Sequence, residues 1–254
     1  MAEVDLLALP VAAAGVFLIA FMKGAFGGGF AIIGIPLLSL VIDPISAGAL
    51  LAPLFIAMDV FAFRYWRPST WSRPDLLMLV PALVVGTALG YAVLSRLDRH
   101  AIEIGMALLT LGFAALWLRG GGQVEARPRS LPKALLFGFG AGITTMVAHS
   151  GGPPLAMYLL PLGLPKAIYA GTTSMFFCVA NLLKAGPWIV LGGPSRGLWI
   201  LTALCLPAVP LGVWVGWRMH ERLDQLQLYR ACYGLLVVTA FKLLWDGVGG
   251  YLGH

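Results

Sequence analysis

Residues 134–165 read ALLFGFGAGITTMVAHSGGPPLAMYLLPLGLP and contain no Asp, Glu, Lys or Arg. One helix needs about 20 apolar residues to cross a bilayer, so this run is too long for a single span. Two glycines and two prolines, from Gly151 to Pro154, interrupt it. Glycine frees the backbone from helical geometry and proline removes a helical hydrogen bond. The run therefore predicts two membrane segments that are separated by a break at residues 149–154.

The composition of the whole chain agrees with a membrane location. Of its 254 residues, 59% are hydrophobic and 11% are charged, and the mean hydropathy is +0.89. A soluble domain carries about 25% charged residues, so a soluble protein is excluded. A disordered chain is less hydrophobic and a disulfide-rich scaffold has more cysteines. Further charge-free runs recur along the chain and predict an all-α polytopic membrane protein with about eight to ten helical segments.

The chain also contains an internal repeat. PALVVGTALGYAVLSRLD at 81–98 aligns without a gap with PAVPLGVWVGWRMHERLD at 207–224, and Pro, Ala, both Gly, Arg, Leu and Asp coincide. A polar, glycine-rich segment lies between the two halves. We therefore divide the chain into a first transmembrane repeat at 1–119, a linker at 120–133 and a second transmembrane repeat at 134–254. Each repeat is expected to hold about four transmembrane helices.

The distribution of arginine and lysine predicts the orientation. The segments 64–73, 119–133 and 218–230 are rich in these residues, whereas the alternate loops are poor in them. Because cytoplasmic loops carry the excess of positive charge, we expect the linker in the cytoplasm and the N-terminus outside. Equivalent loops of the two halves then fall on opposite sides, which is typical of inverted-topology repeats in secondary transporters. Glu3 and Asp5 do not resemble the positive start of a signal peptide, so the first apolar run is expected to remain as structure.

Each repeat has a glycine-rich break in the same place. The first break includes Gly27, Gly28 and Gly29, and the second reads Ser150, Gly151 and Gly152 before two prolines. A broken or re-entrant helix that begins at such a break would direct unpaired N–H groups and a positive dipole end toward an anion. Two such breaks in corresponding positions of two repeats indicate the substrate site of a transporter.

Glycines that only allow close helix packing are the alternative interpretation. We prefer packing for two other pairs, Gly86 with Gly90 and Gly212 with Gly216, because they stand four residues apart within apolar runs. The breaks differ from these pairs because polar residues accompany them.

Polar residues within the apolar runs are the remaining candidates, because ionisable groups inside a bilayer are costly. Lys23 and His149 adjoin the two breaks. Lys23 could bind the anion or extend to the membrane surface, and His149 could bind substrate, relay a coupling proton or donate a structural hydrogen bond. Asp59 could couple a proton or ion, or form a structural pair with Lys184. The predicted substrate site is completed by Lys184, by Asn181 on the same helix face, and by Thr172.

Four stretches of the sequence resemble the sulfite exporter TauE/SafE family of membrane permeases. They are GAFGGGFAIIGIPLLSLV at 24–41, AGALLAPL at 47–54, SGGPPLAMYLLPLGLP at 150–165 and AGTTSMFFCVANLL at 170–183. The resemblance extends over nearly the whole chain and implies ion-coupled export or uptake of sulfite, thiosulfate or organosulfonates. Members of this family often have a third glycine in the second break, where this chain has Pro153, so the exact substrate does not carry over.

The sequence therefore predicts a permease for a small anion that works by alternating access in a bacterial-type inner membrane. A passive anion channel and, with less support, an intramembrane enzyme are the alternatives. The sequence Ala148-His149-Ser150-Gly151 lacks the first glycine of a rhomboid-type motif, and no HExxH is present. The expected partners are the anion, the lipid bilayer and a coupling proton or cation. We expect no cofactor, metal or nucleic acid, and the sequence leaves a homo-oligomer open.

Overall fold

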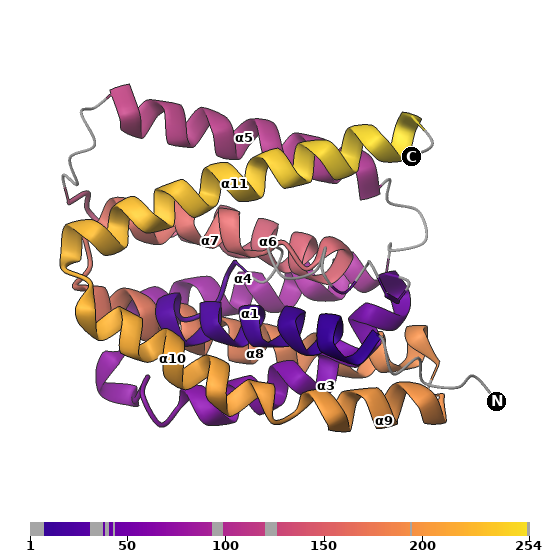
Figure 1. Ribbon diagram of the computed structural model, residues 1–254. Coiled ribbons are helices and arrows are strands. Elements are labelled where there is room, and N and C mark those ends of the chain that lie inside the picture. Colours follow the sequence, from indigo (N-terminus) through magenta and orange to yellow (C-terminus); the bar gives the residue numbers. More distant parts are fainter. Residues whose placement is uncertain are drawn as a thin grey trace. The chain divides into compact units, whose positions relative to one another are not determined.

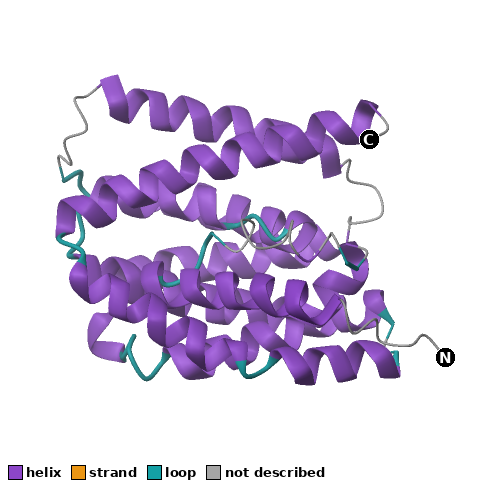
Figure 2. Cartoon of the chain, viewed as in Figure 1, coloured by secondary structure: helices purple, strands orange, loops and turns teal. Residues whose placement is uncertain are grey.

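The computed structural model describes residues 8–30, 38, 41–42, 44–92, 99–119, 126–193 and 195–252. In this part of the chain all regular structure is helical, as Figure 2 shows. Six helical stretches are long and apolar enough to cross a membrane. They are Leu9–Phe26, Ile45–Ala62, Arg73–Ala92, Lys166–Gly192, Arg196–Arg222 and Gln225–Tyr251. The prediction of an all-α polytopic membrane protein is therefore confirmed.

The helices group into two packed units, and each unit takes helices from both halves of the sequence. Unit 1 comprises residues 1–71 and 170–222, and unit 2 comprises residues 72–169 and 223–254. Unit 1 contains α1 (Ala8–Phe26), α3 (Pro44–Ala62), η2 (Pro68–Thr70), most of α8 (Lys166–Gly192), α9 (Arg196–Cys205) and α10 (Ala208–Arg222). Unit 2 contains α4 (Arg73–Ala92), α5 (Arg99–Arg119), α6 (Leu131–Ala148), α7 (Gly152–Leu159), η3 (Leu160–Leu162) and α11 (Gln225–Leu252).

The aligned glycine pairs belong to α10 in unit 1, which packs against α1, and to α4 in unit 2, which packs against α6 (Figure 1). In unit 1, a Cβ added to Gly216 of α10 would lie 2.1 Å from the backbone oxygen of Phe21 in α1. In unit 2, a Cβ added to Gly86 of α4 would lie 2.2 Å from the backbone oxygen of Phe139 in α6. Only glycine permits this approach of the backbones, so the packing prediction for these pairs is confirmed.

The aligned prolines have different effects on their helices. Pro81 lies inside α4, which continues unbroken to Ala92. Pro207 instead lies between α9 and α10, which the hydropathy joins into one candidate span from Arg196 to Arg222. Proline has no backbone N–H, and a membrane helix accommodates this loss either by continuing with local adjustment or by breaking.

The first glycine break terminates α1. Gly27, Gly28 and Gly29 have φ angles of 78°, 103° and 88°, in the left-handed region that side chains disfavour. The three glycines therefore stop the helix at Phe26. A helix beginning after this break would fall at residues 31–37, which lie outside the described residues.

The second break turns the chain back within unit 2. His149, with a φ of 52°, ends α6, and α7 begins at Gly152 and has eight residues. At 1.5 Å per residue α7 is about 12 Å long, which is too short to cross a hydrocarbon core of about 30 Å. The N–H of Arg127, which precedes α6, donates to the carbonyl of Pro161 after α7 at 2.8 Å. The start of α6 and the end of α7 therefore lie together.

Candidate functional site

A buried ion pair is the centre of the polar residues in unit 1. The ammonium of Lys23 in α1 pairs with the carboxylate of Asp59 in α3, and the two residues are 4% and 2% exposed. Each lies three residues before the last residue of its helix. The Lys23 Nζ also donates to the backbone carbonyl of Ser174 in α8 at 3.1 Å. The last turns of α1 and α3 thus meet the first half of α8.

Helix α8 supplies the other side of this cluster. The side-chain amide of Asn181 donates to Asp59 Oδ2 at 2.9 Å, and Lys184 Nζ lies 4.5 Å from the ring centre of Phe55 in α3. Lys184 also interacts electrostatically with both Asp59 and Lys23. All four polar side chains are almost fully buried. We call Lys23, Asp59, Asn181 and Lys184 the charge cluster.

The charge cluster contains two lysine side chains and one aspartate side chain. Burying a charge is costly unless an opposite charge or several hydrogen bonds accompany it. The formal excess of one positive charge therefore favours the approach of an anion. Lys23 has three N–H donors, of which Asp59 and Ser174 take two among the described residues. The cluster can bind a small oxyanion by charge and hydrogen bonding, with no covalent step.

The first glycine break lies against this cluster. A Cβ added to Gly28 would be 3.4 Å from the Lys23 side chain and 3.6 Å from Phe177. A Cβ added to Gly27 would be 1.9 Å from the backbone oxygen of Ala170 in α8. The break therefore packs backbone to backbone on α8, and it sets the position of the helical turn that carries Lys23.

Two side chains bind the free carbonyls at the end of α1. The indole Nε1 of Trp66 donates to the carbonyl of Lys23 at 3.4 Å, and His220 Nδ1 lies 2.8 Å from the carbonyl of Ala25. A carbonyl only accepts, so His220 Nδ1 carries the proton. His220 is 1% exposed and is a residue of this region that was not identified from the sequence. Its spacing of four residues from Gly216 was the available signal, because this places it on the face that packs against α1.

The second group of predicted site residues lies in unit 2. The hydroxyl and the N–H of Ser150 both donate to the carbonyl of Thr144, at 3.4 Å and 3.1 Å. The N–H of His149 donates to the same carbonyl. These contacts close the end of α6. Pro153 and Pro154 fill the first turn of α7 and have no N–H, so this helix start offers fewer donors to an anion than the sequence interpretation assumed.

The structure therefore brings together part of the predicted site. Lys23, Asp59, Asn181, Lys184 and Gly28 gather in unit 1. Thr172 is fully buried on the same helix as Asn181. Asp59 pairs with Lys23 and accepts from Asn181, and Lys184 also interacts with it electrostatically. His149, Ser150, Gly151 and Gly152 belong to the other unit.

A family model matches almost the whole chain. The model described as sulfite exporter TauE/SafE aligns with residues 12–243 and so includes both breaks and the charge cluster. The chain belongs to the sulfite exporter TauE/SafE family. Members of this family are membrane transporters and not enzymes. No curated protein and no solved structure matches the chain.

One polar group of this family member was not anticipated from the sequence. The Asp75 carboxylate in α4 is fully buried and accepts from the hydroxyls of Ser72 and Tyr158, the latter at 3.0 Å. Arg129 Nε lies 3.2 Å from both carboxylate oxygens. These contacts hold α7 and the segment before α6 to the start of α4. Of these contacts, the sequence indicates only the one between Ser72 and Asp75, because their spacing is that of a helix-capping pair.

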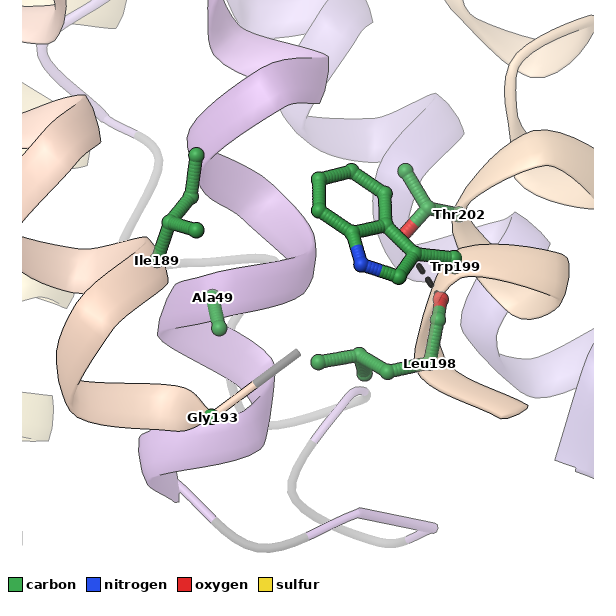
Figure 3. Close-up of a pocket in the computed structure, with 6 residues that line it drawn as sticks. All are labelled: Ala49, Ile189, Gly193, Leu198, Trp199 and Thr202. Atoms are coloured by element: carbon green, nitrogen blue, oxygen red, sulfur yellow. Dashed lines mark hydrogen bonds between the residues drawn. The ribbon is translucent and has the colours of Figure 1, made fainter. Parts of the chain in front are cut away.

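A small pocket between α3, α8 and α9 is unsuitable for the transported anion (Figure 3). Its volume is about 10 Å³, which corresponds to about one water molecule. Ala49, Ile189, Leu198 and Trp199 give it a mainly apolar lining. The hydroxyl of Thr202 donates to the carbonyl of Leu198 at 2.8 Å. The charge cluster is therefore the better candidate.

Proposed function

We propose that the protein is a secondary transporter of a small sulfur oxyanion, namely sulfite, thiosulfate or a short organosulfonate. The observation that carries this proposal is the buried charge cluster with its formal excess of one positive charge. The family match supports an anion permease. The substrate, the alternating-access mechanism and the location in a bacterial-type inner membrane are parts of the proposal.

In this mechanism the anion and Asp59 compete for the ammonium of Lys23. While Asp59 is ionised, its carboxylate takes one donor of Lys23 and neutralises its charge. Protonation of Asp59 removes that competition, so proton uptake and anion binding favour each other. Asn181 holds Asp59 in place through its amide, and Lys184 supplies the second positive charge. This arrangement would make Asp59 the coupling group.

The packing within the units supports a duplicated architecture of the kind that alternating access uses. Helices α4 and α10 carry the aligned glycine pairs, and each packs against the helix that precedes a break, α6 or α1. In unit 2, Asp75 at the start of α4 contacts Arg129 before α6. This contact holds the start of α4 beside the end of the linker, which supports placing these two on one side of the membrane, and we propose that this is the cytoplasmic side.

Counterflow in proteoliposomes tests this function. Vesicles loaded with unlabelled thiosulfate and diluted into labelled thiosulfate should accumulate label transiently, with saturation and stimulation by internal substrate. Flux that neither saturates nor responds to internal substrate would show a passive channel instead.

The variant Asp59→Asn tests the coupling. An amide has no charge that titrates, so exchange should persist while proton-driven uptake and its pH dependence are lost. Ser195→Ala, at the start of α9 and away from the cluster, is the control. Unchanged pH dependence in Asp59→Asn would exclude Asp59 as the coupling group.

A further inference from the structure

A second basic feature of unit 1 lies outside the charge cluster. Arg64, Tyr65, Arg67 and Trp217 line an open hollow of about 600 Å³, which we call the arginine hollow. The first three residues follow the end of α3, and Trp217 lies in the second half of α10. Small-molecule sites commonly measure about 300–1,000 Å³, so the space suffices for an anion with an organic part.

Two aromatic rings form a rigid wall of the arginine hollow. The rings of Tyr65 and Trp217 stack with their centres 4.6 Å apart and their planes at 21°. Arg218 lies over two rings, with its guanidinium 5.8 Å from Trp217 and 5.7 Å from Trp214. Stacked rings and a guanidinium held over them lose little side-chain entropy when a ligand binds.

The arginines at this place have no acidic partner in the part of the chain that the structure describes. Among the described residues no carboxylate pairs with Arg64, Arg67 or Arg218. Guanidinium groups present parallel N–H donors that match the oxygens of sulfonate, sulfite or phosphate. Arginines near stacked aromatic rings therefore present charge and apolar surface to the same ligand.

The loop of the arginine hollow is connected to the charge cluster. Trp66 stands between Tyr65 and Arg67, is 2% exposed, and donates to the backbone carbonyl of Lys23. Its ring also meets the ring of His220 at 4.6 Å, and His220 follows Trp217 on α10 by three residues. An anion held by the arginines thus binds beside the loop that fixes the turn carrying Lys23.

From this geometry we infer that the arginine hollow is a second binding site for an oxyanion, separate from the charge cluster. The ligand is a free sulfur oxyanion or the phosphate of an anionic phospholipid, since both present the same oxygens to the arginines. The rings contact the organic part of either ligand. That a free anion passes from here to Lys23 rests on the proposed function, whereas binding at the arginine hollow does not.

Equilibrium binding of labelled thiosulfate to the full chain in phosphatidylcholine nanodiscs tests the free-anion source. The wild type should bind two equivalents of thiosulfate, and Lys23→Met should retain the equivalent at the arginine hollow. The double variant Arg64→Gln/Arg67→Gln should lose the thiosulfate at the arginine hollow or bind it about tenfold more weakly, as expected when charge-assisted hydrogen bonds are removed. Arg196→Gln, an exposed arginine at the start of α9 in the same unit, is the matched control.

Nanodiscs that also contain phosphatidylglycerol test the lipid source. Native mass spectrometry should show one phosphatidylglycerol fewer on the double variant than on the control. If the double variant loses thiosulfate, the ligand of the arginine hollow is a free anion. If it loses phosphatidylglycerol, the ligand is a lipid headgroup. If the double variant retains both ligands at the level of Arg196→Gln, the inference is overturned. Loss of thiosulfate by Lys23→Met, with full retention of both thiosulfate and phosphatidylglycerol by the double variant, would support the proposed function while rejecting the arginine hollow.

Discussion

Lys23 of α1 and Asp59 of α3 form a buried ion pair at the same distance from the ends of their helices, three residues before the last residue of each. The residues are 36 positions apart in the sequence, counted from their numbers. The carbonyls at a helix C-terminus carry partial negative charge, which stabilises Lys23 in the last turn of α1. This pair joins the first glycine break to the polar face of α8.

The variant Lys23→Met should lose the anion bound at the charge cluster and unfold more readily. It leaves the Asp59 carboxylate buried with Asn181 as its hydrogen-bond donor, which costs about 3–5 kcal/mol for a broken buried pair. The double variant Lys23→Met/Asp59→Asn removes that charge and should recover most of the stability but no anion binding at the charge cluster. Thermal unfolding in detergent and thiosulfate binding measure the two effects. Recovery of the second thiosulfate equivalent in this double variant would contradict a role of Lys23 in the site.

His220 should act on the site by position alone. An Asn side chain places an N–H where His220 Nδ1 donates to Ala25, whereas Gln extends to the position of Nε2. We expect His220→Asn to transport almost normally. His220→Gln and His220→Ala should raise KM and cost about 1–3 kcal/mol of stability for the unsatisfied carbonyl. Transport kinetics at several substrate concentrations distinguish the three. Equal KM values for the Asn and Gln variants would contradict this assignment.

Gly27→Ala should destabilise unit 1 strongly. The left-handed backbone at Gly27 costs a side chain about 1–2 kcal/mol, and the added Cβ would lie 1.9 Å from the oxygen of Ala170. Gly186→Ala is the control, because its Cβ has no atom within 4 Å and Ala favours the helix α8. The yield of folded protein and the temperature of thermal unfolding should fall only for Gly27→Ala. Equal behaviour of the two variants would be inconsistent with close packing at this break.

Tyr158→Phe should loosen α7 without affecting the charge cluster. The variant removes one donor to the buried carboxylate of Asp75, which costs about 1–3 kcal/mol. Limited proteolysis or hydrogen exchange should show faster opening of residues 152–162 within unit 2. Tyr91→Phe, an exposed tyrosine of α4, is the control. Unchanged protection of α7 relative to this control would show that the hydroxyl does not hold the helix.

The apolar character of the spans, the glycine breaks and the packing role of the aligned glycines could all be predicted from the sequence. Hydropathy and the geometry of glycine and proline are local properties, so a short window of sequence is sufficient to read them. The difference between Pro81, inside α4, and Pro207, between α9 and α10, could not be read in this way, because neighbouring helices decide whether a proline breaks a helix.

The sequence by itself determined that this chain is a helical membrane protein, that its helices break at two glycine-rich segments, and that few charges lie within its apolar runs. The tertiary structure alone decided the partners of those charges. It paired Asp59 with Lys23, placed His220 at the end of α1 and joined Asp75 to Tyr158. The physical reason is that burial makes an unpaired polar group costly, while the partner that satisfies it lies on another helix whose position depends on the packing of the whole unit.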